Sequence, residues 1–157
     1  MRRMKLLLVL LLATKLQQVN AVVDDWHKAA AEADEDRYFA HMTSAAVFMG
    51  TDATERWNAT EFREYAHPYF AKGKAWTFIP HDRHVISQGD DVVWFDEKLD
   101  SESYGELRGS GVLIKMNDEW KIAHYNLSIP IPNSIAKNVV VMIRKEKHAP
   151  TPSATPR

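Results

Sequence analysis

The sequence predicts an α+β fold in which helices come first and an antiparallel sheet follows. Two observations support this. Apolar residues recur every three to four positions between residues 14 and 43, which is typical of a long amphipathic helix. From residue 76 to residue 129 the period changes to two, in four runs separated by polar turns, which is typical of strands. Strands that follow helices as a block indicate α+β rather than an alternating α/β fold.

The remaining elements fill the space between these two regions. Residues 45–49 form a short strand candidate that ends at Gly50, and residues 51–57 suit a helical turn. A second helix is expected from Thr60 to Gly73. The four strands are expected at 76–87, 92–99, 106–116 and 119–129, and a last helix follows Asn133 or Ser134.

Length and composition bound the function. A chain of 157 residues with 45% hydrophobic content is sufficient for one domain with a real core. The net charge is −1 with acids and bases interspersed, so we expect no nucleic-acid partner. Cysteine is absent, which excludes disulfides, thiolate metal sites and a cysteine nucleophile. The sequence contains no glycine-rich phosphate loop, HExxH or GxSxG, and we predict no metal and no cofactor.

The N-terminus has the layout of a secretory signal. Three basic residues lie within the first five positions, an apolar run follows to Ala13, and no acidic residue occurs before Asp24. Cleavage after Ala21 would leave small or apolar residues at the required positions, so we predict a secreted or periplasmic protein. The apolar run is too short to cross a bilayer, so we expect no stable membrane anchoring. The alternative is a helical extension of a cytoplasmic protein.

This interpretation divides the chain into three parts. Residues 1–21 are the predicted signal peptide and residues 22–147 the folded domain. Residues 148–157 are rich in proline, serine and threonine, and are predicted to be a disordered tail.

Five stretches resemble a known family. They are FMGTDATERW (48–57), FREYAHPYF (62–70), WFDE (94–97), LRGSGVLIK (107–115) and WKIAHYNLSIPIPN (120–133). The chain resembles the SnoaL-like branch of the nuclear-transport-factor-2-like superfamily. The resemblance implies a cone-shaped fold, in which a curved antiparallel sheet wraps around N-terminal helices and a pocket. It also implies a homodimer through the outer face of the sheet. The superfamily includes polyketide cyclases, ketosteroid isomerases, dehydratases and non-catalytic modules, so the fold alone assigns no activity.

The strand register predicts which side chains share a face. A two-residue turn at Asn117-Asp118 pairs Met116 with Glu119 and, farther along, Gly111 with His124. A loop at 101–104 pairs Glu97 with Arg108. The predicted inner face then carries Trp94, Asp96, Gly109, Gly111, Leu113, Trp120, Ile122, His124 and Asn126. The predicted outer face carries Phe95, Glu97, Arg108, Ser110, Val112, Ile114, Ala123, Tyr125 and Leu127.

Small and polar residues on the inner face predict a ligand site. Gly109 and Gly111 would leave space for a pocket floor, with Trp94 as its roof and Trp57 as a wall. The predicted polar residues in this space are Asp96, His124 and Asn126. An aspartate and a histidine could transfer protons, and the asparagine could donate to a developing oxyanion. The alternative is that these polar groups are buried and satisfy one another.

Three functions remain open from the sequence. The first is an exported small-molecule-binding domain with an apolar pocket. The second is an isomerase, cyclase or dehydratase that transfers protons on a cyclic or aromatic substrate, with Asp96 and His124 as the catalytic pair. The third is an interaction module. Because both sheet faces are substantially apolar, the exposed one predicts a homodimer interface.

Overall fold

A computed structural model describes residues 2–148, and the side-chain surroundings of residues 14–146. Helices α1 and α2 come first, a sheet of six strands contains one inserted helix, and a helix ends the described chain. The helices are α1 (Arg2–Ala31), α2 (Glu35–Ala40), α3 (Ala59–Ala71) and α4 (Ala136–His148). The strands are β1 (Met42–Met49), β2 (Arg56–Asn58), β3 (Ile79–Gln88), β4 (Val92–Ser101), β5 (Gly105–Met116) and β6 (Glu119–Ser128). The predicted α+β class is confirmed.

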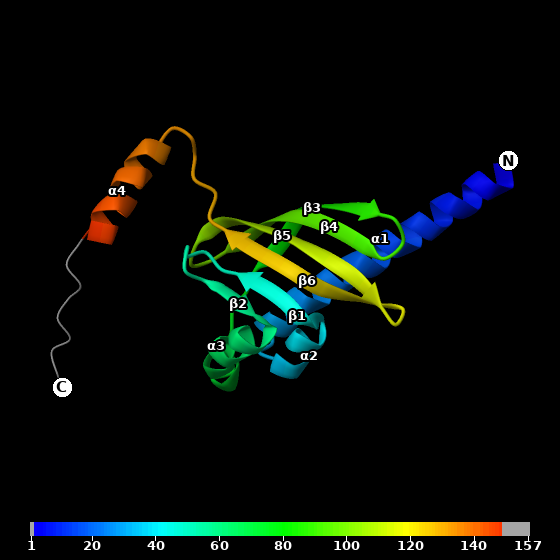
Figure 1. Cartoon of the computed structure of the whole chain (residues 1–157), viewed down its shortest axis with the longest axis horizontal. Coiled ribbons are helices and arrows are strands. Elements are labelled where there is room, and N and C mark those ends of the chain that lie inside the picture. The colour runs from blue at the N-terminus through cyan, green and yellow to red at the C-terminus, as the bar shows by residue number, and fades with distance from the viewer. Residues whose placement is uncertain (1, 149–157) are drawn as a thin grey trace.

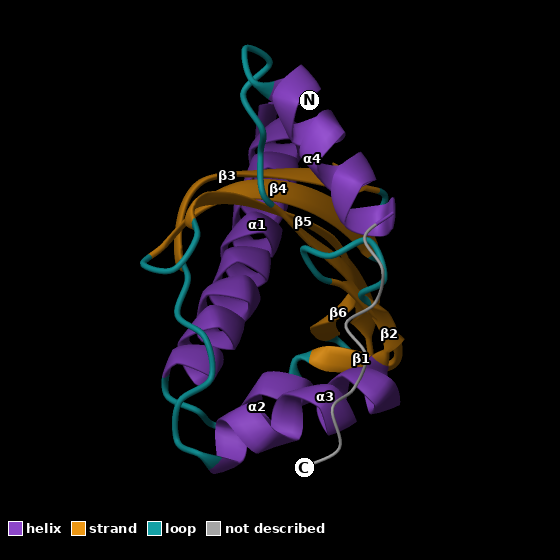
Figure 2. Ribbon diagram, turned by 90° about the vertical axis from the view of Figure 1, so that its left-hand side faces the viewer, coloured by secondary structure: helices purple, strands orange, loops and turns teal. Residues whose placement is uncertain are grey.

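The sheet is curved and mostly antiparallel. Its strand order is β2-β1-β6-β5-β4-β3, and only the β1–β6 pair is parallel. The sheet arches over α1, while α2 and α3 lie across the opening of the arch (Figures 1 and 2). The expected cone of a curved sheet around N-terminal helices is therefore present.

The core lies between the concave face of the sheet and the helices. Trp26 of α1 stacks on Tyr38 of α2 at 4.8 Å between ring centroids and meets the ring of Tyr125 edge-on at 4.6 Å. Leu113 and Ile122 of the sheet are fully buried in the same core. Burying a side chain of this size contributes about 1.5–3 kcal/mol, so these contacts hold the helices to the sheet.

Two helices replace the single long helix predicted between residues 14 and 43. Helix α1 ends at Ala31, and Ala33 takes the left-handed conformation with φ of 54°. Asp34 then caps α2, because its side chain accepts a hydrogen bond from the backbone N–H of Arg37. Farther along, residues 56–58 form the short strand β2 instead of ending a helical turn.

One hairpin register was predicted correctly and one was not. Asn117 and Asp118 both have positive φ, and Met116 pairs with Glu119 as expected. The turn between β4 and β5 has three residues rather than four, because Ser101 pairs with Gly105. As a result Glu97 lies opposite Gly109 instead of Arg108.

A β-bulge in β6 causes a second register error. Leu113 pairs with Ile122, but the next residue of β5, Val112, pairs with His124, so Ala123 is the extra residue. A shift by one residue moves every later side chain to the opposite face. The shorter β4–β5 turn exchanges the two faces for the residues of β4, and the bulge exchanges them for the residues of β6 after Ala123. The prediction of an inner-face position was therefore wrong for Trp94, Asp96, His124 and Asn126, and the interior instead receives Phe95, Glu97, Tyr125 and Leu127.

The ends of the chain extend beyond the cone. Helix α4, whose presence was predicted, stands apart from the sheet (Figure 1). The predicted tail lies outside the described residues, apart from His148. Helix α1 continues through the predicted cleavage point after Ala21, and Val19 before that point is fully buried. Within residues 2–148, no helix combines the length and apolarity needed to cross a membrane.

Candidate functional site

A buried carboxylate lies at the centre of the cone. The side chain of Glu97 on β4 is 1% exposed. Its Oε1 lies 2.7 Å from Nε2 of His27 on α1 and accepts a hydrogen bond of 3.0 Å from the hydroxyl of Tyr125 on β6. Its Oε2 accepts a hydrogen bond of 2.8 Å from Nε of Arg83 on β3. We call these four residues the buried network.

The basic partners of Glu97 offset the cost of burying its charge. Burial alone would raise the pKa of Glu97, but the hydrogen bonds and charges of His27 and Arg83 outweigh it and hold the pKa below its ordinary value. Arg83 also reaches α1, where its Nη1 lies 2.7 Å from Oδ1 of Asp24 and donates to Asn20. The network therefore ties α1 to three strands of the sheet.

The two inner-face glycines make room for this network. A Cβ on Gly109 would lie 2.1 Å from the hydroxyl oxygen of Tyr125 and 3.0 Å from Oε1 of Glu97. A Cβ on Gly111 would lie 2.8 Å from the ring of Phe95. Gly109 and Gly111 lie on the inner face as predicted, but Tyr125, Phe95 and the backbone of His124 occupy the space beside them, so the predicted pocket floor is in the wrong place.

The polar residues predicted for the pocket lie on the outer face instead. Asp96 pairs with His84, whose Nδ1 is 3.2 Å from Oδ1 of Asp96, and not with His124. Asn126 lies in the same cross-strand row as Asp96, and His124 lies in the neighbouring row with Trp94. The interior therefore contains neither member of the predicted catalytic pair.

A cavity of about 360 Å³ opens between β1, β2, α3, the loop after α3 and the β4–β5 turn. We call it the aromatic pocket, because eight of its fourteen lining residues are aromatic. Its lining is Phe48, Gly50, Thr51, Glu55, Trp57, Phe62, Tyr65, Tyr69, Ala75, Trp76, Phe78, Ser103, Tyr104 and Leu127. Trp57 is the one residue of the predicted site that lines it.

The walls of the aromatic pocket are built from stacked rings. Trp57 stacks on Tyr65 with 4.4 Å between centroids and an interplanar angle of 24°, and Tyr65 lies 5.7 Å from Tyr69. Tyr65, Tyr69 and Tyr104 are 41%, 45% and 55% exposed. Partial burial, the neighbouring Tyr69 and the charge of Glu55 raise the pKa of Tyr65 to about 12. At neutral pH its hydroxyl is therefore protonated.

The aromatic pocket and the buried network adjoin each other. Phe48 lines the pocket and lies 5.7 Å from the ring of Tyr125, while Phe78 lines it and meets His27 edge-on at 6.4 Å. The imidazole and the carboxylate behind these rings are 4% and 1% exposed. The network thus supports the inner wall of the pocket without forming its surface.

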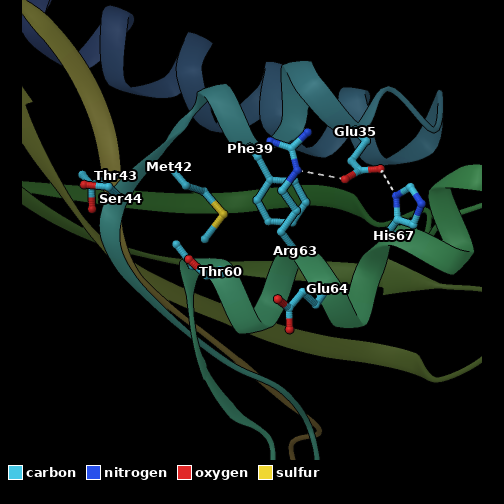
Figure 3. A pocket seen from close by; sticks show the side chains of 10 residues that line it. Glu35, Phe39, Met42, Thr43, Ser44, Thr60, Arg63, Glu64 and His67 are labelled. Carbon is cyan, nitrogen blue, oxygen red and sulfur yellow. Dashed lines mark hydrogen bonds and ion pairs between the residues drawn. The ribbon is translucent and has the colours of Figure 1, made fainter.

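A second and larger hollow, of about 700 Å³, lies between α2, α3 and the start of β1 (Figure 3). Phe39 and Met42 line it beside charged side chains. Glu35 accepts a hydrogen bond of 2.9 Å from Nε of Arg63, and its other oxygen lies 2.7 Å from Nδ1 of His67. Because Glu35, Arg63 and His67 already pair with one another in this hollow, we place the functional site in the aromatic pocket instead. In the part of the chain that is described, no three histidine, aspartate or glutamate side chains are grouped to hold a metal ion.

A comparison with known protein families identifies the family of this chain. A family profile described as a SnoaL-like domain matches residues 19–132, which is more than two thirds of the chain. The chain belongs to the SnoaL-like domain family. No curated protein sequence matches it.

Solved structures place this SnoaL-like protein among nuclear-transport-factor-2-like (NTF2-like) folds. One is an NTF2-like protein of unknown function from Pseudomonas putida, at 13% identity and a TM-score of 0.66, covering 77% of this chain and 90% of that one. Another is a proposed dehydratase of the NTF2-like family from Streptomyces avermitilis, at 15% identity and a TM-score of 0.66, covering 76% and 99%. A third is a proposed aromatic ring hydroxylase from Novosphingobium aromaticivorans, at 15% identity and a TM-score of 0.61, covering 74% and 89%. At these identities the likeness shows the fold alone.

The sequence contains a signal for the buried network in the side-chain pattern of β4. Val93, Phe95 and Leu99 share one parity along β4, and Glu97 is the only charged residue in that apolar series. A lone charge in phase with apolar neighbours indicates a buried, paired group. His27 follows the same logic, since it lies beside Trp26 on the buried side of α1.

Proposed function

We propose that this SnoaL-like protein binds a small, largely apolar molecule in the aromatic pocket. The observation that supports the proposal is the set of eight aromatic side chains around a cavity of about 360 Å³. Ligand sites are typically clefts of about 300–1,000 Å³ with mostly apolar walls and a few polar groups. Here those polar groups are the tyrosine hydroxyls and the carboxylate of Glu55.

The proposal can be tested by filling the pocket. Ala75 lines the cavity and is partly buried, so Ala75→Trp would occupy part of the ligand volume. Ala71 is exposed at the end of α3 and does not line it, so Ala71→Trp is the matched control. Titration with 2-naphthol, followed by ligand NMR line broadening, should give at least about tenfold weaker binding in the first variant alone. Equal binding in both variants would contradict the proposal.

A second candidate function is an enzyme that transfers protons on a cyclic or aromatic substrate, of the isomerase, cyclase or dehydratase type. The observation that favours it is the imidazole–carboxylate pair of His27 and Glu97 directly behind the pocket wall. Such a pair can hold a histidine in one tautomer, and it would act as a general base only if the ring of Phe78 moved aside to let the ligand reach the imidazole. Asp96 and His124, predicted for this role from sequence, lie on the outer face and do not line the pocket.

The two functions can be separated by comparing binding with turnover. For an enzyme, His27→Gln should abolish the conversion of a bound compound, because glutamine cannot take up the proton that a general base removes. For a binding protein, incubation of the parent chain with a co-purified ligand should leave that ligand chemically unchanged, as shown by mass spectrometry.

We also propose that the outer face of the sheet forms a homodimer. Ile86 and Trp94 lie in one cross-strand row and are 49% and 39% exposed, and the row continues through the partly exposed Val112. An apolar strip of this kind on a soluble domain is typical of a partner surface.

Export remains a proposal that rests on the N-terminal sequence. The basic start and apolar run satisfy the requirements of a secretory signal. Cleavage after Ala21 would, however, remove Lys15, which donates a hydrogen bond of 2.8 Å to the carbonyl of Gly89. N-terminal sequencing of protein from the native source would test export by cleavage, and an intact Met1 would contradict it.

A further inference from the structure

The aromatic pocket has a one-sided electrostatic character. Among the fourteen described residues that line it, Glu55 is the only one with a full charge, and none is lysine, arginine or histidine. A cavity without a cationic side chain gives no counter-ion to an anionic ligand. A carboxylate beside aromatic faces instead offers two kinds of attraction to a positive charge.

The carboxylate of Glu55 is fixed in place by its own loop. Its Oε2 accepts a hydrogen bond of 3.1 Å from the backbone N–H of Asp52. A Cβ on Gly50 would lie 2.2 Å from the same oxygen, so only glycine lets the carboxylate pack against this point of the chain. The backbone of residues 50–55 is closed by a hydrogen bond of 3.0 Å from the Gly50 N–H to the Glu55 carbonyl. The charge is therefore positioned before any ligand arrives.

The rings at the mouth of the pocket are available to a ligand. Tyr65, Tyr69 and Tyr104 expose two fifths to more than half of their surface, and Trp57 stacks behind Tyr65 at 4.4 Å. The carboxylate of Glu55 lines the same cavity as these rings, and its negative charge adds to the burial and the Tyr69 contact that raise the pKa of Tyr65. Several aromatic faces around one volume, with a single carboxylate, form the arrangement that recognises quaternary and protonated amines.

We propose that the aromatic pocket selects an organic cation, an amine or quaternary ammonium group carried on an apolar or aromatic body. This inference rests on the proposed function and adds the charge of the ligand to it. The apolar body would contact the inner rings Phe48, Phe62 and Phe78, and the cationic head would lie among Trp57, the tyrosines and Glu55.

Three probes of the same shape test this proposal. Phenyltrimethylammonium, tert-butylbenzene and benzenesulfonate each carry a benzene ring and a tetrahedral head group, with charges of +1, 0 and −1. NMR titration of the full chain should show the cation binding about tenfold more tightly than the neutral probe, and the anion binding least. The shifts should fall on pocket residues such as Trp57 and Tyr65.

Two variants locate the origin of the preference. Glu55→Gln keeps an oxygen that can accept from the Asp52 N–H, and should remove most of the preference for the cation without weakening the neutral probe. The matched control is Glu64→Gln, a carboxylate on α3 that lines the other hollow. Should Glu55→Gln lower the melting temperature, Tyr104→Leu at the exposed rim replaces it and should weaken cation binding several-fold. Neutral and cationic probes that bind the pocket equally well would overturn the cation proposal and leave the proposed function standing. Absence of pocket shifts with every probe would overturn both.

Discussion

Replacing Gly109 with alanine adds a methyl group at the point where Tyr125 and Glu97 meet. The new Cβ would lie 2.1 Å from the Tyr125 hydroxyl oxygen, 2.9 Å from its Cζ and 3.0 Å from Oε1 of Glu97. Real Cβ contacts are longer than this, so the tyrosine must move and its hydrogen bond of 3.0 Å to the carboxylate must break. Overpacking of a core costs about 1–3 kcal/mol, and loss of a hydrogen bond to a charged group about 1.5–3 kcal/mol. Movement of the tyrosine both relieves the overpacking and breaks the hydrogen bond, so the two costs overlap and do not simply add. We therefore expect Gly109→Ala to lower the free energy of unfolding by about 3 kcal/mol.

Urea unfolding monitored by tryptophan fluorescence would measure this loss. Ser110→Ala, one residue along on the outer face, is the matched control and should change the free energy of unfolding by no more than about 0.5 kcal/mol. In a Tyr125→Phe background the closest contact is absent, so the same glycine substitution should cost at least about 1 kcal/mol less. A Gly109→Ala variant as stable as the control would refute the register that pairs Gly109 with Glu97 and Leu127.

Three further predictions concern charge, the N-terminus and assembly. Glu97→Gln should lower the free energy of unfolding by about 3 kcal/mol at pH 7, because it removes the buried carboxylate that pairs with Arg83 and leaves the exposed Asp24 as the charged partner of this arginine. The pKa of Glu97 is lower in the folded protein than in the unfolded chain. The stability that the Glu97 charge contributes is therefore complete above the unfolded pKa, near 4.3, and is lost as the pH falls through the folded pKa. If urea titrations showed the same stability difference between the parent chain and Glu97→Gln at pH 7 and at pH 3, this explanation would be contradicted. Deletion of residues 1–21 should lower the free energy of unfolding by about 2 kcal/mol more than deletion of residues 1–13, because only the longer deletion removes the fully buried Val19. Equal thermal stability of the two truncated proteins would disprove this. Val112→Asp on the outer face should convert a dimer into a folded monomer in analytical ultracentrifugation, whereas a parent chain that is already monomeric would exclude the dimer.

The sequence predicted the fold because its signals were local and repeated. The change of period from helical to alternating, together with the Asn117-Asp118 turn, was sufficient to separate the helical region from the sheet and to place the last hairpin. The site was harder to predict, because it depended on two single-residue details. The three-residue turn before Gly105 and the bulge at Ala123 leave the number of residues in strands almost unchanged. Each of them nevertheless moves the side chains of one strand to the opposite face of the sheet.

The bulge could have been detected from hydrophobic phase. Trp120 and Ile122 share one parity, while Tyr125 and Leu127 share the other. Both pairs can be buried only if one residue is inserted between them, and Ala123 fills that role. For the aromatic pocket, the sequence predicted Trp57 as a wall but not the cavity around it. The walls of the pocket come from β1, the β1–β2 loop, β2, α3, the loop after α3 and the β4–β5 turn, and only the folded chain brings these segments together.

The position of a bound ligand tests most directly whether the aromatic pocket is the functional site. Two-dimensional NMR of the full chain with ¹³C-labelled tryptophan and tyrosine rings, titrated with 2-naphthol, would locate it. We predict saturable shifts for Trp57, Tyr65 and Tyr104, with Trp94 unchanged on the outer face. Saturable shifts confined to Trp94, with the three pocket rings unchanged, would contradict the assignment and return the site to the outer face of the sheet.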